Sequence, residues 1–377
     1  MTQDGEPQAK RVKESEDNEE KNTPVEKNES ENERNYDQEL LEAAKANDFE
    51  KVKELIEKYD ADTTHQEDET GSSALMLAAA HGNCEMIQFL LENHAVWNAV
   101  DRQHKCAGDY AVDGGHQPAI DKLLRHGVIS EMLLGRAALN ATKEQKQKKM
   151  DAQGFEDNRA YLRSKLKYDN NKVEGLLLDD KEDAVMMSWE TKLMEEHARL
   201  ICHNKGSVLN VGHGMGIVDG KIQANNPAHH TIIEAHPDVL KRLRETGWYD
   251  KPNVTILEGR WQDVIHKAGP FDGVFYDTYA EDDADLKEFH SHLPRILKEN
   301  GIYSFYNGCC PDNLFFHGVA CEVMKLELED LGLSCEYTAM EVNVSDPEMW
   351  EKVRRRYWYR NTYYVPLCKK MEVLDCT

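Results

Sequence analysis

The chain has 377 residues, 40% of them apolar, and a formal net charge of −24. This length and apolar content are enough for two or three domains with separate cores. The strong negative charge argues against direct binding of nucleic acid, because a phosphate backbone binds basic surfaces, and it favours a basic partner.

The cysteines and the N-terminal segment indicate the compartment. None of the nine cysteines forms a C-x-x-C pair with zinc-site spacing, so no metal site is predicted. An odd, scattered set is typical of reduced intracellular thiols. The sequence has no apolar segment of signal-peptide type and no apolar run of membrane-span length. We therefore expect a cytoplasmic and nuclear protein without a membrane contact.

Residues 1–36 are rich in Glu, Asn and Lys and contain almost no large apolar side chain. Such a segment cannot bury enough apolar surface to offset the entropy of the chain. We predict a disordered acidic tail.

The next region, residues 37–128, contains three similar segments. Each has a short helix of small residues, a Gly or Asn turn and a second apolar helix, and Val52, Ile87 and Ile120 occupy equivalent places. Their spacings of 35 and 33 residues resemble the period of ankyrin repeats. Stacked repeats usually bind proteins, so the region is predicted to dock a partner; a generic helical bundle is the alternative. The segments are residues 40–58, 74–93 and 109–127.

Residues 129–160 are predicted to form a helical, heavily charged linker. From residue 161 to 377 apolar strands alternate with amphipathic helices, which is the pattern of a doubly wound sheet. The predicted fold is therefore an α/β, Rossmann-like domain preceded by an all-α, ankyrin-like module. Strands are expected at the starts of the segments 207–223 and 231–247, at ILEGR as the third strand, and within the segments 271–279 and 301–308.

The segment SVLNVGHGMGIVDGKIQ, residues 207–223, is predicted to be a strand, a glycine-rich turn and the start of a helix. Such a turn lets the backbone approach a ligand and places helix amides beside it. Glu234 follows at the end of the next strand, where an acid can accept hydrogen bonds from two ribose hydroxyls. Nicotinamide, flavin and S-adenosylmethionine folds share this pattern, and glycine turns also occur without a ligand.

Three features favour S-adenosylmethionine. The motif G-H-G-M-G lacks the third glycine at the spacing that suits a pyrophosphate. Asp277, at the end of the strand GVFY, fits a methyl-acceptor site better than a hydride site. The segment GRWQDV supplies an aromatic side chain and polar groups for an adenine. The alternative for Asp277 is a cap on the next helix.

Together, VMMSWETKLM (185–194), VLNVGHGMGIVDGKIQ, TIIEAHPDVLKRLR, LEGRWQDV, FDGVFYDTY and LPRILKENGIYSFYNG resemble guanidinoacetate N-methyltransferase. They resemble still more its relatives with ankyrin-like N-terminal halves, the type IV protein arginine N5-methyltransferases. The resemblance covers residues 185–310 best. It implies methylation of the delta nitrogen of arginine in a protein, with a ribosomal protein as the expected substrate.

The chemistry of that reaction explains two acids. A guanidinium is a poor nucleophile because its charge is delocalised, and two carboxylates can hold it with one nitrogen facing the methyl group. Asp277 and Glu190 are the predicted catalytic pair, with Asp277 as base or as stabiliser of charge.

The resemblance also implies which residues bind S-adenosylmethionine. Met186, Glu190, Met194 and His197 are placed on one face of a helix over residues 183–201, a stripe that ordinarily means core packing. Tyr168, with Tyr161 as second choice, is expected to close over the cofactor. The predicted cofactor contacts are Tyr168, Met186, Met194, His213, Gly214, Met215, Gly216, Ile217, Val218, Glu234, Ala235, His236, Trp261, Gln262 and Asp277.

Some residues depart from the small-substrate pattern. Asn210 replaces an acid, His213 replaces an aromatic residue, and YNGCCPDN stands where C-N-L-T-S-W is expected. The missing polar groups favour a substrate anchored elsewhere, as a protein arginine would be. A small guanidino compound as substrate, or a cofactor-binding scaffold without catalysis, remain the alternatives. Residues 353–368 are predicted to complete the sheet as an edge hairpin.

Overall fold

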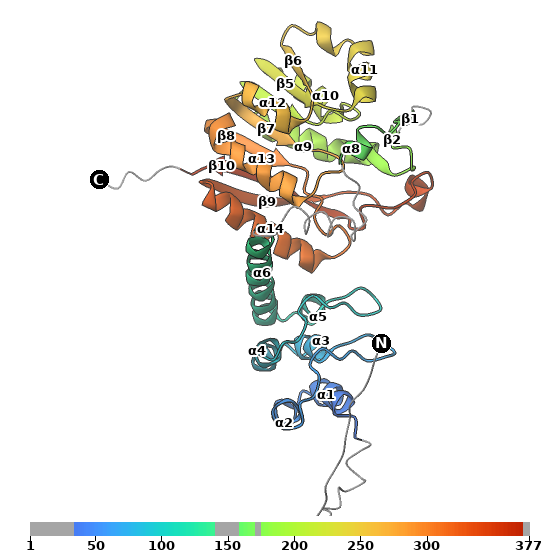
Figure 1. The fold of residues 1–377 in the computed structure, drawn as a ribbon, viewed down its shortest axis with the longest axis vertical. Helices are drawn as coiled ribbons and strands as arrows, with labels where there is room; N and C mark the ends of the chain where they lie inside the picture. Colours follow the sequence, from blue (N-terminus) through green and yellow to red (C-terminus); the bar gives the residue numbers. More distant parts are fainter. Residues whose placement is uncertain (1–33, 140–157, 170–174, 372–377) are drawn as a thin grey trace, which may run out of the picture.

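The computed structural model describes residues 34–139, 158–169 and 175–371, and it shows a stack of helix pairs beside an α/β domain (Figure 1). Most of the predicted tail and most of the predicted linker lie outside the described residues. The domain boundaries therefore stay predictions. No helix in the described ranges is long and apolar enough to cross a membrane.

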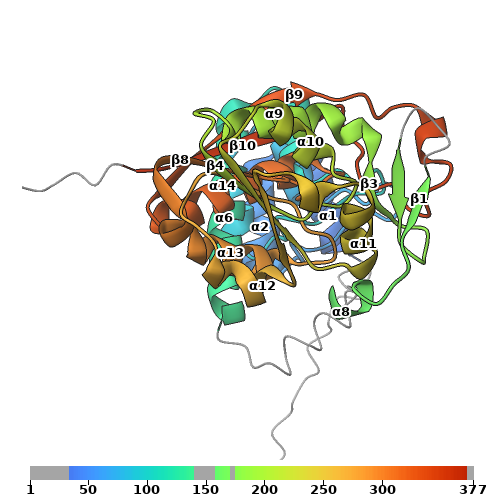
Figure 2. The ribbon, with the colours of Figure 1, turned by 90° about the horizontal axis from the view of Figure 1, so that it is seen from above.

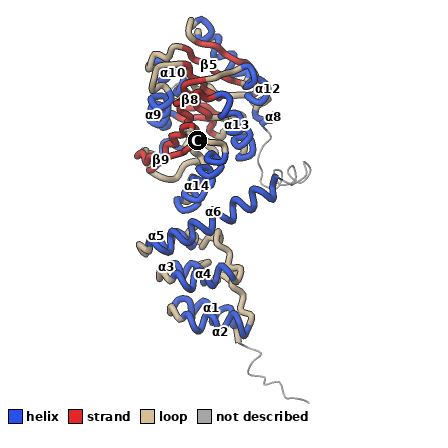
Figure 3. The backbone as a smooth tube through the Cα atoms, turned by 90° about the vertical axis from the view of Figure 1, so that its left-hand side faces the viewer, coloured by secondary structure: helices blue, strands red, loops and turns tan. Residues whose placement is uncertain are grey.

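The N-terminal region is a stack of three helix pairs, as Figure 3 shows. Side chains of Asn35, Asp48, Ser73 and Asn83 accept hydrogen bonds from the first turns of four of its helices, which fixes where these helices begin. The six helices are α1 (Tyr36–Lys45), α2 (Phe49–Tyr59), α3 (Ala74–Ala80), α4 (Cys84–Glu92), α5 (Ala107–Asp113) and α6 (Gln117–Leu139).

The repeat spacing predicted from the sequence corresponds to equivalent positions in this stack. Val52 and Ile87 are fully buried on α2 and α4, and Ile120 is partly buried on α6. Each pair thus buries an apolar face that it could not bury alone. The predicted ankyrin-like module is confirmed.

A seam joins the repeats to the α/β domain. Helix α14 (Leu314–Asp330) packs along α6, and its Phe315 is buried in the core of the repeats. Gly108 makes room for that ring, because a Cβ there would lie 2.1 Å from Phe315 Cγ. Asn313 Nδ2 donates to Asp109 Oδ2 at 2.6 Å. The repeats are therefore held against the α/β domain by the apolar packing of Phe315 and by the hydrogen bond between Asn313 and Asp109.

The main sheet has the strand order β6-β5-β4-β7-β8-β10-β9. The first five strands in this order are parallel, and β10 runs antiparallel to both neighbours. The order reverses between β4 and β7, the point where open α/β sheets bind ligands. The strands are β4 (Ser207–Val211), β5 (His229–Glu234), β6 (Val254–Glu258), β7 (Phe271–Tyr276), β8 (Leu297–Phe305), β9 (Leu333–Glu341) and β10 (Thr362–Lys370).

Helices cover both faces of this sheet. Leu209 and Val274 pack with α12, α13 and α14, whereas Val208 and Phe275 pack with α9 and α10. This alternation of apolar residues on two faces confirms the predicted Rossmann-like fold. The remaining helices are α8 (Asn158–Tyr161), α9 (Thr191–Ile201), α10 (Ile217–Ala224), α11 (Pro237–Glu245), α12 (Trp261–Val264) and α13 (Asp283–Ile296).

A small antiparallel sheet precedes α9 and lies at the edge of the domain, beside α8 and α11 (Figure 2). Its strands are β1 (Lys167–Asp169), β2 (Leu176–Leu178) and β3 (Ala184–Met187). The predicted helix over residues 183–201 is therefore wrong in its first part. Met186 lies in β3 and pairs with Leu177, and α9 begins only after a 3-10 turn at Ser188–Glu190.

The predicted edge hairpin over residues 353–368 is also wrong. Only Thr362–Lys370 forms a strand, and β10 lies between β8 and β9 rather than at the edge. The preceding aromatic run is irregular because Trp358 is fully buried and Tyr357 points to a buried acid, so these side chains are fixed by tertiary contacts.

Candidate active site

The glycine turn after β4 brings the backbone close to the end of β7. Gly212 has a φ of +95°, and a Cβ there would lie 1.9 Å from the carbonyl oxygen of Asp277. Gly214 and Gly216 also have positive φ, and Gly216 caps the start of α10. Only glycine combines this conformation with so close an approach. At the switch point of the sheet, the turn therefore exposes backbone without side chains to the space above it.

Glu234 fastens this turn at the end of β5. One carboxylate oxygen, Oε2, accepts from the backbone N–H of His213 at 2.8 Å, and Oε1 accepts from Ala235 and His236, both at 2.7 Å. Both lone pairs of Oε1 are used by these two bonds, whereas Oε2 has a further lone pair for a ligand donor. Glu234 also lines the cavity above the turn, so a ribose hydroxyl there would meet an oriented acceptor.

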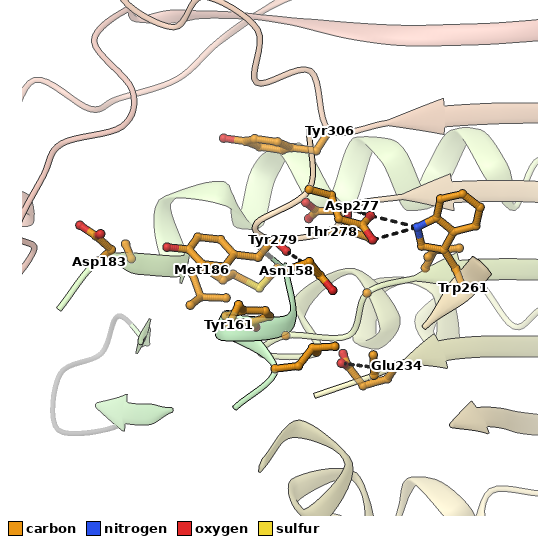
Figure 4. A pocket seen from close by; sticks show the side chains of 18 of the residues that line it. Asn158, Tyr161, Asp183, Met186, Glu234, Trp261, Asp277, Thr278, Tyr279 and Tyr306 are labelled. Carbon is orange, nitrogen blue, oxygen red and sulfur yellow. Dashed lines mark hydrogen bonds between the residues drawn. The ribbon is translucent and has the colours of Figure 1, made fainter. Parts of the chain in front are cut away.

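A cavity of about 400 Å³ lies over the turn (Figure 4). Of the predicted site residues, the structure brings Met186, Glu190, Gly214, Glu234, Ala235, Trp261 and Asp277 to its wall. Tyr161, the second choice for the aromatic cover, lines it as well, with its ring 4.8 Å from the rings of both His236 and Tyr279. The wall mixes apolar, aromatic and acidic groups, which suits a cofactor with an adenosine and a charged end.

Glu190 and Asp277 both line this cavity. Glu190 ends the 3-10 turn before α9, and its Oε1 accepts from the backbone N–H of Met187 at 3.2 Å and from the hydroxyl of Tyr357. Asp277 follows β7 and is partly exposed to the cavity. No described residue donates a hydrogen bond to its carboxylate.

Burial perturbs both acids. Burial, together with the nearby charge of Asp277, raises the pKa of Glu190 to about 8. Burial alone raises the pKa of Asp277 to about 7. Two neighbouring acids with raised pKa values in one cavity are typical of a site that binds a cationic ligand or a proton. Such a pair can bind a cation and accept a proton from it.

The other predicted cofactor residues lie behind this wall. Met194 and Val218 are fully buried in the core beneath the sheet, and Gln262 Nε2 donates to Glu281 at 3.1 Å. The hydroxyl of Tyr168 donates to the carbonyl of Gly214 at 3.2 Å and so supports the turn from outside. Within the described residues the wall does not include Tyr168, Met194, His213, Met215, Gly216, Ile217, Val218, His236 or Gln262, and their cofactor contacts stay predictions.

The ring of His213 faces away from the cavity. Its Nδ1 lies 2.6 Å from Asp219 Oδ2, and His230 Nε2 lies 2.9 Å from the other oxygen of Asp219. Trp248 packs edge-on against both imidazoles. These groups form a buried cluster behind the turn. Because the ring of His213 belongs to this cluster, only its backbone could make the predicted contact with the cofactor.

Several wall residues have no local signal in the sequence. Tyr306 follows β8, and Tyr357 belongs to the run that was predicted to form a hairpin. Glu281, in the run AEDD after Tyr279, accepts hydrogen bonds from Trp261 Nε1 at 2.9 Å and from Thr278 at 2.7 Å. The only local signal for Glu281 is its spacing of three residues from Thr278, which suits a hydrogen bond between the two side chains. Tyr306 and Tyr357 reach the cavity through the packing of distant segments.

The strand order, the glycine turn and the strand-end acids together define a Rossmann-like methyltransferase. Family models agree: one described as guanidinoacetate N-methyltransferase matches residues 150–332, and one described as ankyrin repeats (3 copies) matches residues 40–131.

Curated relatives define the family more closely. Protein arginine N-methyltransferase 2 of Aspergillus oryzae is 35% identical over 326 residues, which cover 76% of this chain and 78% of that protein. The protein of the same name from Saccharomyces cerevisiae is 32% identical over 319 residues, with 75% and 76% covered, and that of Cryptococcus neoformans is 36% identical over 335 residues, with 81% and 87% covered. The chain belongs to the protein arginine N-methyltransferase 2 family, and the resemblance seen in the sequence is confirmed.

Proposed function

We propose that this enzyme transfers a methyl group from S-adenosylmethionine to the delta nitrogen, N5, of arginine in a basic protein. The observation that carries the proposal is the pair Glu190 and Asp277, which face one cavity above the glycine turn. The name of the relatives, protein arginine N-methyltransferase 2, supports arginine as the acceptor.

The residues present fit S-adenosylmethionine. The bare turn at Gly214 and the oriented carboxylate of Glu234 would hold its adenosine half, and Trp261 and Ala235 line the same part of the cavity. When bound, S-adenosylmethionine supplies a methyl group on a sulfonium. The apolar wall formed by Met186, Tyr161 and Trp261 would exclude water from that group.

Glu190 and Asp277 would hold the acceptor. A guanidinium has five N–H donors in a fixed fork, and carboxylates on two sides can bind it by charge-assisted hydrogen bonds. The positive charge between the two acids favours their ionised forms and offsets the cost of burial. Asp277, which has no donor among the described residues, would accept the proton that leaves the methylated nitrogen.

The repeats and the charge of the chain support a protein substrate. A metabolite needs no docking surface, whereas three stacked repeats offer one, and the net charge of −24 favours a basic partner. A ribosomal protein is the substrate that the family resemblance implies, and such a substrate is consistent with the proposed cytoplasmic and nuclear location.

A second function is supported by one observation. The family model described as guanidinoacetate N-methyltransferase matches the catalytic half, so a small guanidino compound is the competing acceptor. A scaffold that binds cofactor without catalysis is disfavoured by the presence of both acids.

Labelled S-adenosylmethionine tests the proposal. The wild type and Asp277→Asn are incubated with a basic ribosomal-protein fraction and, separately, with guanidinoacetate, and methylarginine is fragmented in a mass spectrometer. We expect delta-methylarginine in protein, lost in the variant. Label in guanidinoacetate alone would contradict a protein substrate. If neither the ribosomal-protein fraction nor guanidinoacetate is labelled although the protein binds the cofactor, the result would support a scaffold without catalysis.

A further inference from the structure

We infer that the acceptor arginine reaches Asp277 through a second, acidic cavity, and that basic residues flank this arginine in the substrate; the inference rests on the proposed function. The second cavity measures about 240 Å³ and lies between the start of α13 and the segment after β8. It shares four lining residues with the first cavity: Asp277, Thr278, Glu281 and Tyr306. The two spaces therefore meet at the predicted catalytic acid.

Two polar groups without partners mark the place where the cavities meet. Among the described residues the carboxylate of Asp277 accepts no hydrogen bond, and the buried hydroxyl oxygen of Tyr306 has no hydrogen-bond partner. A buried polar group without a partner is costly, so a ligand that supplies donors would be bound there. A guanidinium supplies donors in several directions at once.

The opposite end of the first cavity does not suit a cationic acceptor. Asp183 at that end is bound by Arg354 and by Arg355, whose Nη2 lies 3.1 Å from it, and the side chain of Arg355 is 75% exposed. Arg356 lines the same end. An approaching arginine would meet guanidinium groups of the enzyme there, and like charges repel.

The second cavity has the complementary charge. Asp282 and Asp283 line this cavity, Asp283 is exposed, and Asp312, two residues after Cys310, is also exposed. Lys287 stands nearby, but its Nζ is paired with Glu327 at 2.7 Å.

Helix α6 of the repeats adds a further acid. The charges of Asp312, Asp283 and Glu131 all act on the thiol of Cys310, whereas Arg360 acts on it in the opposite sense. Acids from α13, from the loop before α14 and from α6 thus lie near Cys310, whose neighbour Cys309 lines the second cavity. Such a group of acids attracts a basic segment and raises its rate of association.

Apolar side chains continue this surface onto the repeats. Leu133 and Leu134 on α6 are 62% and 60% exposed, and Leu314 at the start of α14 is 48% exposed. A Cβ on Gly135 would lie 3.8 Å from Lys287 Nζ, which places this part of α6 beside α13. The occupant is therefore a basic segment of the substrate protein that also carries apolar residues toward α6.

Charge reversal at the second cavity tests the route. Two synthetic peptides carry one arginine, flanked in one by lysines and in the other by serines. We expect the double variant Asp283→Lys/Asp312→Lys to lower kcat/KM for the lysine-flanked peptide at least tenfold, mostly through KM. The serine-flanked peptide should change less than threefold, and the affinity for S-adenosylmethionine should not change.

The matched control reverses charge at the other end. Glu348 and Glu351 are exposed and precede Arg354, which pairs with the cavity-lining Asp183, so Glu348→Lys/Glu351→Lys adds the same charge on the segment that leads to this end. We expect this control to change kcat/KM for the lysine-flanked peptide less than twofold. If the control loses tenfold and Asp283→Lys/Asp312→Lys keeps wild-type values, the route through the second cavity is wrong although the proposed function stands.

Cross-linking gives a second readout that does not depend on a rate. The lysine-flanked peptide carries a benzophenone side chain next to its arginine, and cross-links are mapped by mass spectrometry. Cross-links to residues 282–286 or 308–310 are expected, and cross-links to residues 183–186 or 355–357 would overturn the route. If the wild type methylates the ribosomal-protein fraction but neither peptide, the same variants are compared on that fraction. If it methylates no arginine at all, the proposed function itself fails.

Discussion

Acids lie both behind and in front of the glycine turn, and they differ in whether the fold supplies them with cationic partners. Behind the turn, Asp219 is fully buried and contacts His213, His230 and Asn210, whose Nδ2 lies 2.8 Å from it. In front of the turn, Glu190 and Asp277 face a cavity and have no cationic partner among the described residues.

The pKa shifts of the two groups point in opposite directions. Burial acts to raise the pKa of Asp219, but the charges and hydrogen bonds of His213 and His230 lower it below its ordinary value. Burial raises the pKa values of Glu190 and Asp277. Burial alone therefore does not identify a functional acid. The acid that the fold leaves uncompensated is the one available to a ligand.

Removing an uncompensated acid should have the largest effect on activity. We expect Asp277→Asn to reduce methyl transfer about 10²- to 10⁴-fold, because the proton acceptor and one half of the guanidinium clamp are lost. The melting temperature should not fall, since the variant replaces a carboxyl that has no hydrogen-bond donor among the described residues. A lower melting temperature with full activity would contradict this role.

Removing the compensated acid should show the reverse pattern. Asp219→Asn leaves the imidazoles of His213 and His230 without their anion, at a cost of about 3 kcal/mol. We expect thermal unfolding of the methyltransferase domain to shift down by roughly 10 °C. Asp277→Asn is the matched control, because it makes the same chemical change on the other side of the turn. Equal melting temperatures of the two variants would contradict the proposed difference between the compensated and the uncompensated acid.

The raised pKa values should appear in the pH dependence of the reaction. A protonated carboxyl cannot pair with a guanidinium, so kcat/KM should fall about tenfold from pH 8 to pH 7 and further below. The tyrosines around the acids stay neutral, since burial raises the pKa values of Tyr306, Tyr357 and Tyr363. A flat profile between pH 6 and pH 8, measured with saturating cofactor, would contradict the assignment.

The same shift affects stability with a definite sign. In the unfolded chain Asp277 and Glu190 lose their protons near pH 4, whereas in the folded chain they keep them to about pH 7 and 8. The folded state therefore binds more protons in this window, and these two acids lower stability as the pH rises through it. Bound guanidinium should remove this penalty.

The smallest expected effect concerns the support of Glu190. Trp189 Nε1 donates to the hydroxyl of Tyr357 at 2.9 Å, and this hydroxyl donates to Glu190. Tyr357→Phe removes a bond that favours the ionised carboxylate, so we expect about a fivefold loss of kcat/KM at pH 7. The pH profile should shift toward higher pH, a change that a purely structural role would not cause. A loss that is equal at every pH would contradict it.

Much of the site could be predicted from short patterns. The positive φ values of the glycine turn and the acid at the end of β5 follow from residue types at fixed spacing, and the apolar run before Asp277 places this acid at a strand end. The start of α9 could not be predicted, because Met186 and Met187 suit a helix stripe and a strand equally well. They form a strand because they pair with Leu177 and Leu176 in the small sheet.

Local patterns along the chain predict the order of its elements: three repeats, then a strand, a glycine turn and a helix, with Glu234 and Asp277 at strand ends. Periodicity and backbone conformation are local properties, so residue types at fixed spacing reveal them. Three features follow only from the packing of whole elements: Phe315 closes the core of the repeats, Tyr357 donates a hydrogen bond to Glu190, and Asp277 lines two cavities. These contacts join segments far apart in the chain, and they depend on how whole elements pack, which no local pattern specifies.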